Sequence, residues 1–432
     1  MKTFLQPLQN LAEMEEIEKQ AKKNHGILEV SGCIESQKAH LMYGLSGLFP
    51  CHLVIAADEK SAKELYEDYR FYDKRVYYYP AKDLLFFQAD IHGNLLIRQR
   101  MQVIRALLER EDEITVVTSI DGCMDYLAPL EKIEKQLIHF RNDSTLDMDK
   151  LTAALVHMGY ERVGQVEMPG QFSIRGGIID IYSLTEENPW RIELWGDEID
   201  SIRSFDAQSQ RSLENLDDVT IYPAAEQPME KNGVSFLDYF KETETLFFLD
   251  ELNHLEENAK AVQEEFQQSC ENRKEKGEIS LSGDWMCTWE ELCHKINDRN
   301  CVAMSLLDPK KSNWKISGQF NITVKSMSSY QSSFELLVKD LKQYKKEEYQ
   351  IVLLSGSRTR AERLAKDLQE EGLNAFYGQD SDRILQPGEI MVAYGHARRG
   401  FEYPLVKFAV ITETDIFGKE QKKRKKKKEY NG

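Results

Sequence analysis

Short apolar runs alternate with longer amphipathic stretches across residues 28–118, and this alternation is the strongest constraint on how the chain can fold. A short apolar run bounded by turn residues favours a buried strand, whereas apolar positions at helical spacing favour an amphipathic helix. Strands that are separated by helices pair in parallel. The sequence therefore predicts a parallel sheet covered by helices. The same alternation returns at residues 333–418.

Closely spaced strands replace this alternation after a helix that we expect at about residues 148–160. The runs that follow are short and are separated by Gly, Pro and Asn, which is typical of antiparallel strands. We therefore predict a multidomain α/β chain, in which a parallel-sheet, P-loop-like domain holds an inserted small α+β antiparallel module and is followed by a second small α/β domain. The predicted boundaries are 1–133 and 213–332 for the P-loop-like domain, 134–212 for the module, 333–418 for the last domain, here called the third domain, and 419–432 for a basic linker.

The charge of the chain is unevenly distributed. The net charge is −17, yet the tail from Lys419 onward carries eight basic and two acidic residues, so the body before it is strongly acidic. An acidic body is not typical of a protein that holds duplex DNA through phosphate contacts. Any nucleic-acid role should therefore be local or act through a partner. The tail has no apolar residue before Tyr430, which predicts a solvated linker with more protein beyond it.

Several classes of protein are excluded by composition. The seven cysteines are scattered and form no C-x-x-C pair, which argues against a disulfide framework and a zinc knuckle. The apolar runs are far shorter than the ~20 residues that a membrane span needs, and acidic residues follow the N-terminus too early for a secretory signal. We therefore expect a cytoplasmic protein without a metal site.

Residues 32–39, Gly-Cys-Ile-Glu-Ser-Gln-Lys-Ala, lie between a predicted strand and a predicted helix. They align with the phosphate-loop pattern G-x-x-x-x-G-K-[ST], in which Gly32 and Lys38 match. Gln37 replaces the glycine that lets backbone N–H groups surround the phosphates, and Ala39 replaces the hydroxyl that binds Mg²⁺. We therefore expect a degenerate nucleotide site, with no cofactor bound by this part of the protein.

An apolar run at residues 246–249 is followed by Asp250 and Glu251, which resemble the metal-binding and water-positioning carboxylates of a Walker B segment. These acids have little to act on, because the Mg²⁺ ligand is missing and Glu35 places a negative charge where phosphates would lie. Phosphoryl transfer depends on positioning and charge neutralisation. The sequence therefore predicts no catalytic residue here. A strand–glycine–helix joint that never bound a nucleotide would give the same pattern.

The stretch from Gly170 to Arg211 is the most specific pattern in the sequence. It comprises GQFSIRGGIIDIY, then WRIELWGDEIDSIRSFD, then SQRS. This succession resembles the module that the excinuclease subunit UvrB shares with the transcription-repair coupling factors. A less marked resemblance to the same family extends through the P-loop-like domain and the third domain to the basic linker.

The residues of this stretch have the composition of a protein-binding face. Strand alternation places Arg191, Glu193 and Trp195 on one face, and the two glycines after Arg175 permit a turn that presents this arginine outward. An exposed tryptophan flanked by arginines is typical of the centre of an interface. The resemblance implies that the face binds the damage-sensing subunit UvrA in competition with UvrB, through Arg175, Arg191 and Trp195. The neighbouring charged residues are expected to hold the module together: Asp197, Asp200, Arg203, Asp206 and Arg211.

The resemblance implies a non-catalytic N-terminal part of a transcription-repair coupling factor, which recruits UvrA to stalled transcription complexes in nucleotide excision repair by mimicking UvrB. The longer protein would be an ATP-dependent DNA translocase that acts on RNA polymerase and DNA. Two alternatives stay open. A UvrB-like, ATP-dependent, DNA-binding excinuclease subunit would need an intact phosphate loop, and a scaffold could use the same face for another partner.

Overall fold

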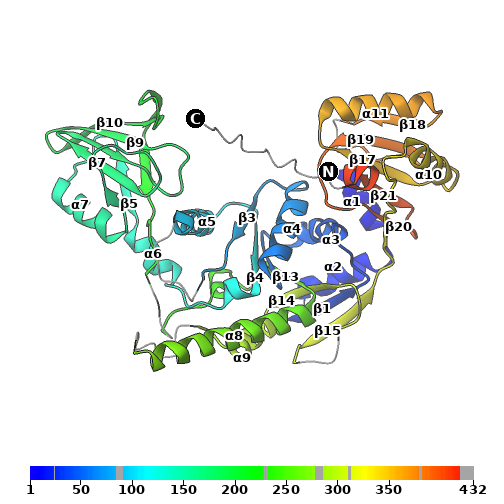
Figure 1. Cartoon of the computed structure of the whole chain (residues 1–432), viewed down its shortest axis with the longest axis horizontal. Coiled ribbons are helices and arrows are strands. Elements are labelled where there is room, and N and C mark those ends of the chain that lie inside the picture. Colours follow the sequence, from blue (N-terminus) through cyan, green and yellow to red (C-terminus); the bar gives the residue numbers. More distant parts are fainter. Residues whose placement is uncertain are drawn as a thin grey trace, which may run out of the picture. The chain divides into compact units, whose positions relative to one another are not determined.

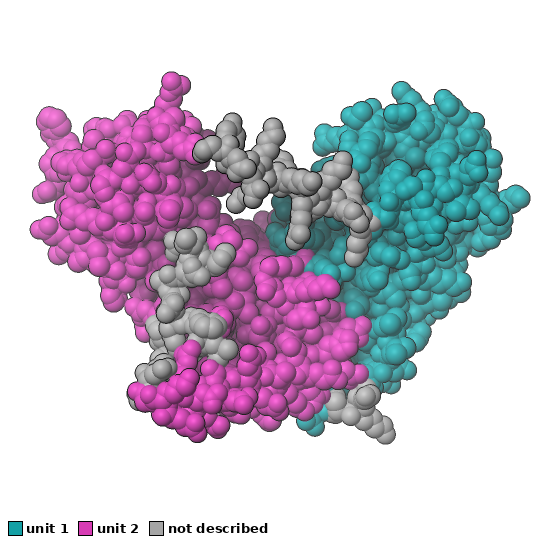
Figure 2. Space-filling view, in the orientation of Figure 1, with its two compact units in different colours: residues 1–48, 64–74, 301–432 teal, residues 49–63, 75–300 magenta. Residues whose placement is uncertain are grey.

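The computed structural model describes residues 1–23, 25–83, 91–227, 229, 232–277, 286–309, 313–378 and 382–418. The chain forms two compact units, and each unit is assembled from segments that are distant in sequence (Figure 2). Unit 1 comprises residues 1–48, 64–74 and 301–432, and unit 2 comprises residues 49–63 and 75–300. The predicted basic linker at 419–432 lies outside the described residues.

The first part of unit 1 combines helices with parallel strands (Figure 1). The strands follow the order β15–β1–β14, and β1 pairs with β15 in parallel. All six residues of β1 are buried, as expected for a parallel strand that is covered on both faces. The elements are α1 (Lys2–Gln9), α2 (Met14–Lys23), β1 (Gly26–Ser31), α3 (Gln37–Leu45), η1 (Ser46–Leu48), the end of α4 (Glu59–Arg70), β14 (Asn300–Ser305) and β15 (Ile316–Asn321).

The third domain forms the rest of unit 1. Its sheet has the order β16–β20–β21–β17–β19–β18, with parallel pairing among β17, β18, β19 and β21. The sheet begins upstream of the predicted boundary at residue 333, because β16 pairs with β20 and Met327 enters the core. The elements are β16 (Lys325–Ser326), α10 (Phe334–Lys346), β17 (Gln350–Ser355), α11 (Arg358–Glu370), β18 (Asn374–Tyr377), β19 (Glu389–Tyr394), β20 (Phe401–Tyr403), β21 (Phe408–Thr412) and α12 (Glu413–Phe417).

Unit 2 contains the parallel strands predicted from the first alternation. Their order is β13–β2–β4–β3, and each neighbouring pair is parallel. The predicted combination of a helix-covered parallel sheet with smaller antiparallel sheets is therefore confirmed. The elements are β2 (Cys51–Ala56), the start of α4, β3 (Val76–Tyr79), α5 (Ile91–Leu108), β4 (Ile114–Ser119), η2 (Ile120–Cys123), η3 (Phe236–Tyr239), β13 (Thr245–Asp250), α8 (Leu252–Glu275) and α9 (Trp289–Asn297).

The inserted module in unit 2 is built on a six-stranded sheet with the order β11–β10–β9–β8–β7–β6. Its pairs are antiparallel except for β6 and β7, and α7 contributes Leu151 and Leu155 to the core. The sheet continues past the predicted module end at residue 212. The elements are α6 (Leu130–Gln136), β5 (Ile138–Arg141), α7 (Met148–His157), β6 (Glu161–Arg162), β7 (Gln171–Arg175), β8 (Ile178–Ile181), β9 (Trp190–Trp195), β10 (Glu198–Phe205), β11 (Ser212–Leu216) and β12 (Asp218–Ile221), which pairs with β5.

Neither a membrane-spanning helix nor a metal-binding cluster is found among the described residues. None of the helices in the described part of the chain has the length and apolar character needed to cross a membrane. Within the same residues, no group of three or more His, Cys, Asp or Glu side chains is arranged to hold a metal ion.

An aromatic cluster with a buried histidine forms part of the core of unit 1. The ring of His40 on α3 lies against the rings of Phe4, Tyr72, Phe401 and Phe408. His40 Nε2 is 2.8 Å from the carbonyl oxygen of Phe4, and because a carbonyl oxygen only accepts, Nε2 carries the hydrogen. Burial lowers the pKa of His40 to about 4. The imidazole is therefore neutral at physiological pH.

Gly32 joins β1 to the loop before α3 in a backbone conformation that favours glycine. Its φ is +83°, and a Cβ atom at this position would overlap the carbonyl oxygen of Ile322. The glycine that matches the start of the phosphate-loop pattern is therefore required by the close approach of another backbone. Gly47 has no atom within 4 Å of the corresponding Cβ position and offers a matched comparison.

We predict that Gly32→Ala lowers the free energy of unfolding by about 3 kcal/mol, because the Cβ atom meets rigid backbone and the positive φ adds strain. Gly47→Ala should change the same quantity by less than about 0.5 kcal/mol. Urea denaturation of both variants measures the difference. Equal effects of the two substitutions would contradict the packing account.

We predict that His40 makes the chain sensitive to acid. The unfolded histidine binds a proton below its usual pKa of 6.5, whereas the folded one resists protonation down to about 4. The free energy of unfolding is therefore highest above pH 6.5 and falls by about 3 kcal/mol as the pH drops to 4. Urea denaturation between these pH values measures how the free energy of unfolding changes with pH. This change should be smaller in His40→Gln than in the wild type, whereas His139→Gln, at an exposed histidine, should behave like the wild type. Equal slopes for His40→Gln and the wild type would exclude this role.

Candidate docking face and degenerate phosphate loop

The predicted docking residues lie on one side of the module sheet. Arg175 ends β7, and a turn through Gly176, whose φ is +60°, leads into β8. The strand register places Asp180 of β8 opposite Arg191 of β9, and Arg191 opposite Arg203 of β10. Residues that lie directly opposite each other in neighbouring strands project from the same face. The face therefore contains a carboxylate among three arginines.

Asp180 is the centre of this arrangement. It is 1% exposed, and its two oxygens accept three hydrogen bonds. Arg191 donates from Nε at 2.8 Å and from Nη2 at 2.9 Å, and Arg175 donates from Nη2 at 2.9 Å. A buried carboxylate is tolerated only when it is paired and hydrogen-bonded. Asp180 therefore holds both arginines that the sequence singles out.

Arg191 lies inside the face. Its side chain is 13% exposed, and Nη2 also donates to Gln210 Oε1 at 2.8 Å. The guanidinium lies 4.2 Å from the centroid of the Phe205 ring, which is a favourable cation–π distance. Hydrogen bonding to Asp180 raises the pKa of Arg191 above its usual value. These contacts indicate that Arg191 supports the sheet, and little of its side chain is accessible to a partner.

Trp195 and Arg175 are exposed on this face, as is Glu198, which the strand register places opposite Trp195. Trp195 is 83% exposed, which is the largest exposed fraction among the large hydrophobic residues of the described chain. The side chain of Arg175 is 50% exposed although one of its N–H groups is bound to Asp180. Isolated exposed apolar residues are ordinary, but an exposed tryptophan beside an arginine has the composition of an interface centre.

Two of the surrounding charged residues, Arg203 and Asp206, support a strand pair and a turn. Arg203 Nη2 donates to Glu193 Oε1 at 2.6 Å across β9 and β10. The carboxylate of Asp206 accepts from the backbone N–H groups of Gln208 and Ser209, and the Ser209 bond lowers the pKa of Asp206. The other three residues of this predicted set, which are exposed, are Asp197, Asp200 and Arg211.

Our interpretation of the sequence missed the central role of Asp180. The signal that could have revealed it is a single acidic residue between isoleucines in a strand that is otherwise apolar. Such a residue must find a partner on a neighbouring strand. Two further residues complete the surroundings of Arg191, Phe205 at the end of β10 and Gln210 in the turn between β10 and β11, and neither had a separate signal in the sequence.

The loop at residues 32–36 uses its backbone donors within the protein. Gly32 N donates to Leu306 O at 3.2 Å, and Cys33 N donates to Ser305 O at 3.0 Å. Ile34 N donates to the side-chain Oε1 of Gln37 at 3.0 Å. A phosphate loop binds its ligand through such N–H groups. The first three donors of this loop are therefore already engaged.

Gln37 and His40 of α3 connect the loop to Tyr403 of β20. Gln37 Nε2 donates to Tyr403 Oη at 3.1 Å, and His40 Nδ1 is 2.9 Å from the same oxygen. Because Nε2 of His40 carries the hydrogen, Nδ1 accepts, and the tyrosine hydroxyl donates to it. All three residues are 0% exposed, so the residue that replaced the loop glycine belongs to a fully buried hydrogen-bonded chain.

A basic pair in the third domain completes these contacts. The backbone N–H and Nε of Arg398 each donate to Asp68 at 3.0 Å, and Asp68 is 1% exposed. The backbone N–H of Arg399 donates to Ser36 Oγ at 3.1 Å, and its Nε lies 3.6 Å from the carboxylate of Glu35. Residues 398–403 therefore contact both the loop and the helix that follows it.

The other residues of the predicted nucleotide site are distributed between the two units. Lys38 and Ala39 are buried on α3 in unit 1. Asp250 ends β13 in unit 2 and is buried, and Glu251 follows it with a left-handed φ of 54° just before α8. The structure thus brings Gly32, Gln37, Lys38 and Ala39 together in one unit and places the two acidic residues in the other.

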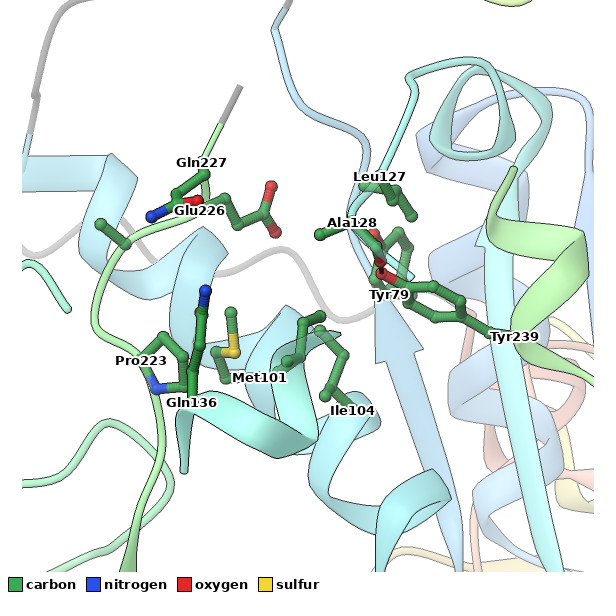
Figure 3. Close-up of a pocket in the computed structure, with 12 residues that line it drawn as sticks. Tyr79, Met101, Ile104, Leu127, Ala128, Gln136, Pro223, Glu226, Gln227 and Tyr239 are labelled. Atoms are coloured by element: carbon green, nitrogen blue, oxygen red, sulfur yellow. Dashed lines mark hydrogen bonds between the residues drawn. The ribbon is translucent and has the colours of Figure 1, made fainter. Parts of the chain in front are cut away.

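A cluster of charged residues in unit 2 anchors the chain that leaves the module. No sequence pattern indicated this cluster. Figure 3 shows a small cavity between Pro223–Gln227 and the residues around Tyr239. Beside it, the fully buried Arg100 of α5 donates to Asp125 at 3.0 Å and to Glu226 at 3.1 Å. These ion pairs attach the segment that follows the module to α5, and we assign them a structural role.

The predicted docking residues lie in a region that matches a known domain type. The UvrB interaction domain matches residues 138–226, a range that contains Arg175, Asp180, Arg191 and Trp195. A solved DEAD-box helicase, Mss116 bound to ssRNA and UDP-BeF, aligns over 91% of this chain and 64% of its own, but its TM-score of 0.26 and 9% identity support no inference.

The chain is also similar to curated proteins over most of its length. The transcription-repair-coupling factor of Bacillus subtilis (strain 168) is 29% identical over 473 residues, which cover 92% of this chain and 40% of that protein. The factor of Staphylococcus haemolyticus (strain JCSC1435) is 26% identical over 409 residues, covering 82% and 34%. The chain thus spans less than half the length of these relatives. The resemblance predicted from the sequence is confirmed: this chain is similar to transcription-repair-coupling factors and includes a region that matches the UvrB interaction domain.

Proposed function

We propose that this chain is the non-catalytic, UvrA-recruiting part of a transcription-repair-coupling factor and that it acts by presenting a UvrB-like face. The observation that carries the proposal is the exposure of Trp195 and of Arg175, which is held by the buried Asp180, inside the range that matches the UvrB interaction domain. In the cell, this face would bring UvrA to a stalled transcription complex for nucleotide excision repair.

The face has the chemistry to bind an acidic surface with an apolar depression. Arg175 keeps half of its side chain exposed, and a guanidinium can bind a carboxylate through two parallel hydrogen bonds. Trp195 supplies a large apolar area at low conformational cost. Arg191 instead holds Asp180 and Gln210, so we assign it to positioning, in place of the direct contact that the sequence suggested.

We further propose that this chain performs no nucleotide chemistry. The engaged N–H groups of the loop, the buried Gln37 and the absence of a hydroxyl at Ala39 support this proposal. They disfavour the alternative of a UvrB-like ATP-dependent excinuclease subunit. ATP-dependent DNA translocation, with RNA polymerase and DNA as partners, would belong to parts of the relatives that this chain does not span. A cytoplasmic location follows from this proposed role.

We predict that Trp195→Ala weakens UvrA binding at least about 30-fold and that Arg175→Ala weakens it about tenfold, because both lie at the proposed interface centre. Val156→Ala and Lys150→Ala, at exposed positions of α7, are the matched controls and should bind like the wild type. Titration calorimetry with purified UvrA measures the affinities. Wild-type affinity in folded Trp195→Ala would refute the interface, and no UvrA binding by the wild type would leave the alternative of a scaffold with another partner.

We predict that Arg191→Ala acts first on the stability of the module. Its removal leaves the buried Asp180 with Arg175 as its remaining arginine partner, which should lower the free energy of unfolding by about 3 kcal/mol. Thermal denaturation should show this loss in Arg191→Ala and little change in Arg175→Ala, whose side chain is half exposed. If Arg191→Ala weakened UvrA binding without any loss of stability, Arg191 would be a direct contact after all.

A further inference from the structure

The third domain has a contact whose purpose the docking proposal does not explain. Its residues 398–403 lie on the degenerate loop and on α3, within unit 1. We infer that the degenerate loop is a docking site for this segment of the chain, and that the third domain serves as the built-in occupant of the former nucleotide site. This inference is independent of UvrA binding, because the two proposals share no residue.

The substitution at position 37 favours such an occupant. A glycine there would have no side chain to reach Tyr403, whereas the amide of Gln37 donates to Tyr403 Oη and accepts from Ile34 N. The same hydroxyl donates to His40, which in turn donates to Phe4 O. Every member of this buried chain therefore has a partner, and fully satisfied polar networks specify a unique packing. The change that removes the phosphate-binding glycine is the change that creates the link.

A charged side chain of the loop also takes the place of a nucleotide phosphate. Glu35 supplies a carboxylate in the loop itself, with a φ of 24° that is uncommon for a residue other than glycine. Arg399 lies 3.6 Å from this carboxylate and 3.7 Å from the carboxylate of Asp415, and its backbone N–H donates to Ser36. The negative charge that a phosphate would bring is thus part of the chain, and an arginine of the third domain faces it.

The contact is anchored beside the loop by the ion pair between Arg398 and the buried Asp68. Asp68 accepts from the backbone N–H and from Nε of Arg398, and Nη1 of Arg398 lies 2.9 Å from Glu64. Charge-assisted hydrogen bonds to a buried carboxylate are stronger than neutral ones. Residues 398–403 therefore bind through polar groups along their length. A nucleotide and this segment would compete for the loop residues 35 and 36.

Hydrogen–deuterium exchange of the full chain tests the docking. In Arg398→Ala, we expect the amides of residues 32–45 to exchange about tenfold faster, and in Tyr403→Phe about fivefold faster, because each variant loses part of the contact. The matched controls are Arg363→Ala and Tyr377→Phe, which lie in the third domain away from the loop contacts given above. Exchange in residues 171–205 should not change in any variant. Unchanged exchange of residues 32–45 in both test variants would overturn the inference.

A titration with Mg²⁺-ATP tests the replacement of the nucleotide. The wild type should not bind the nucleotide. The loop-restored variant, Gln37→Gly with Ala39→Ser, should either not bind it, or bind it only with an increase in the exchange rate of the amides of residues 398–403. Both results support a segment that excludes the nucleotide. Saturable binding with unchanged exchange of residues 398–403 would overturn it. Should the restored variant fail to fold, the exchange of residues 32–45 in the conservative Tyr403→Phe still decides the inference by the criterion given above. UvrA affinity is expected to stay at the wild-type value in Tyr403→Phe, so the two proposals can fail separately.

Discussion

Asp180 is buried on the face of an antiparallel sheet, and the arrangement of that face depends on how its charge is neutralised. A carboxylate in this position needs partners from neighbouring strands, and it obtains them from Arg191 and Arg175. The cost of leaving it unpaired fixes the register and keeps Arg191 within the sheet. Trp195 is then the exposed end of a strand whose other polar residues are already engaged. The interaction that stabilises the module is therefore also what selects the residues available to a partner.

The same principle applies in unit 1, where the loop that aligns with the phosphate-loop pattern is packed against the third domain. The loop keeps the strand–glycine–helix geometry, but Gly32 is required by the backbone of Ile322, and Gln37 is bound to Tyr403. Neutral His40 completes the buried chain of hydrogen bonds. Both units thus use buried polar groups to hold a fixed conformation, which agrees with the proposed role in recognition without a cycle of nucleotide binding and release.

The sequence predicts the elements well because strand and helix periodicities are local. The parallel strands, the antiparallel module and the position of the Arg175 turn all follow from patterns within a few residues. Strand alternation also places Arg191 on the correct face, but it carries no information about Asp180 or Phe205, which decide how much of Arg191 is exposed. The link between His40 and Tyr403 joins positions 363 residues apart, and no local pattern encodes such a contact.

The central claim is that the face around Trp195 imitates the corresponding face of UvrB, and competition for UvrA tests it most directly. Purified UvrA is bound to this chain, UvrB is added in increasing amounts, and the fraction of the complex that remains is measured. If the two proteins use one site on UvrA, UvrB displaces the chain completely and the apparent affinity of each falls in proportion to the concentration of the other. A stable ternary complex of UvrA, UvrB and this chain would contradict the account.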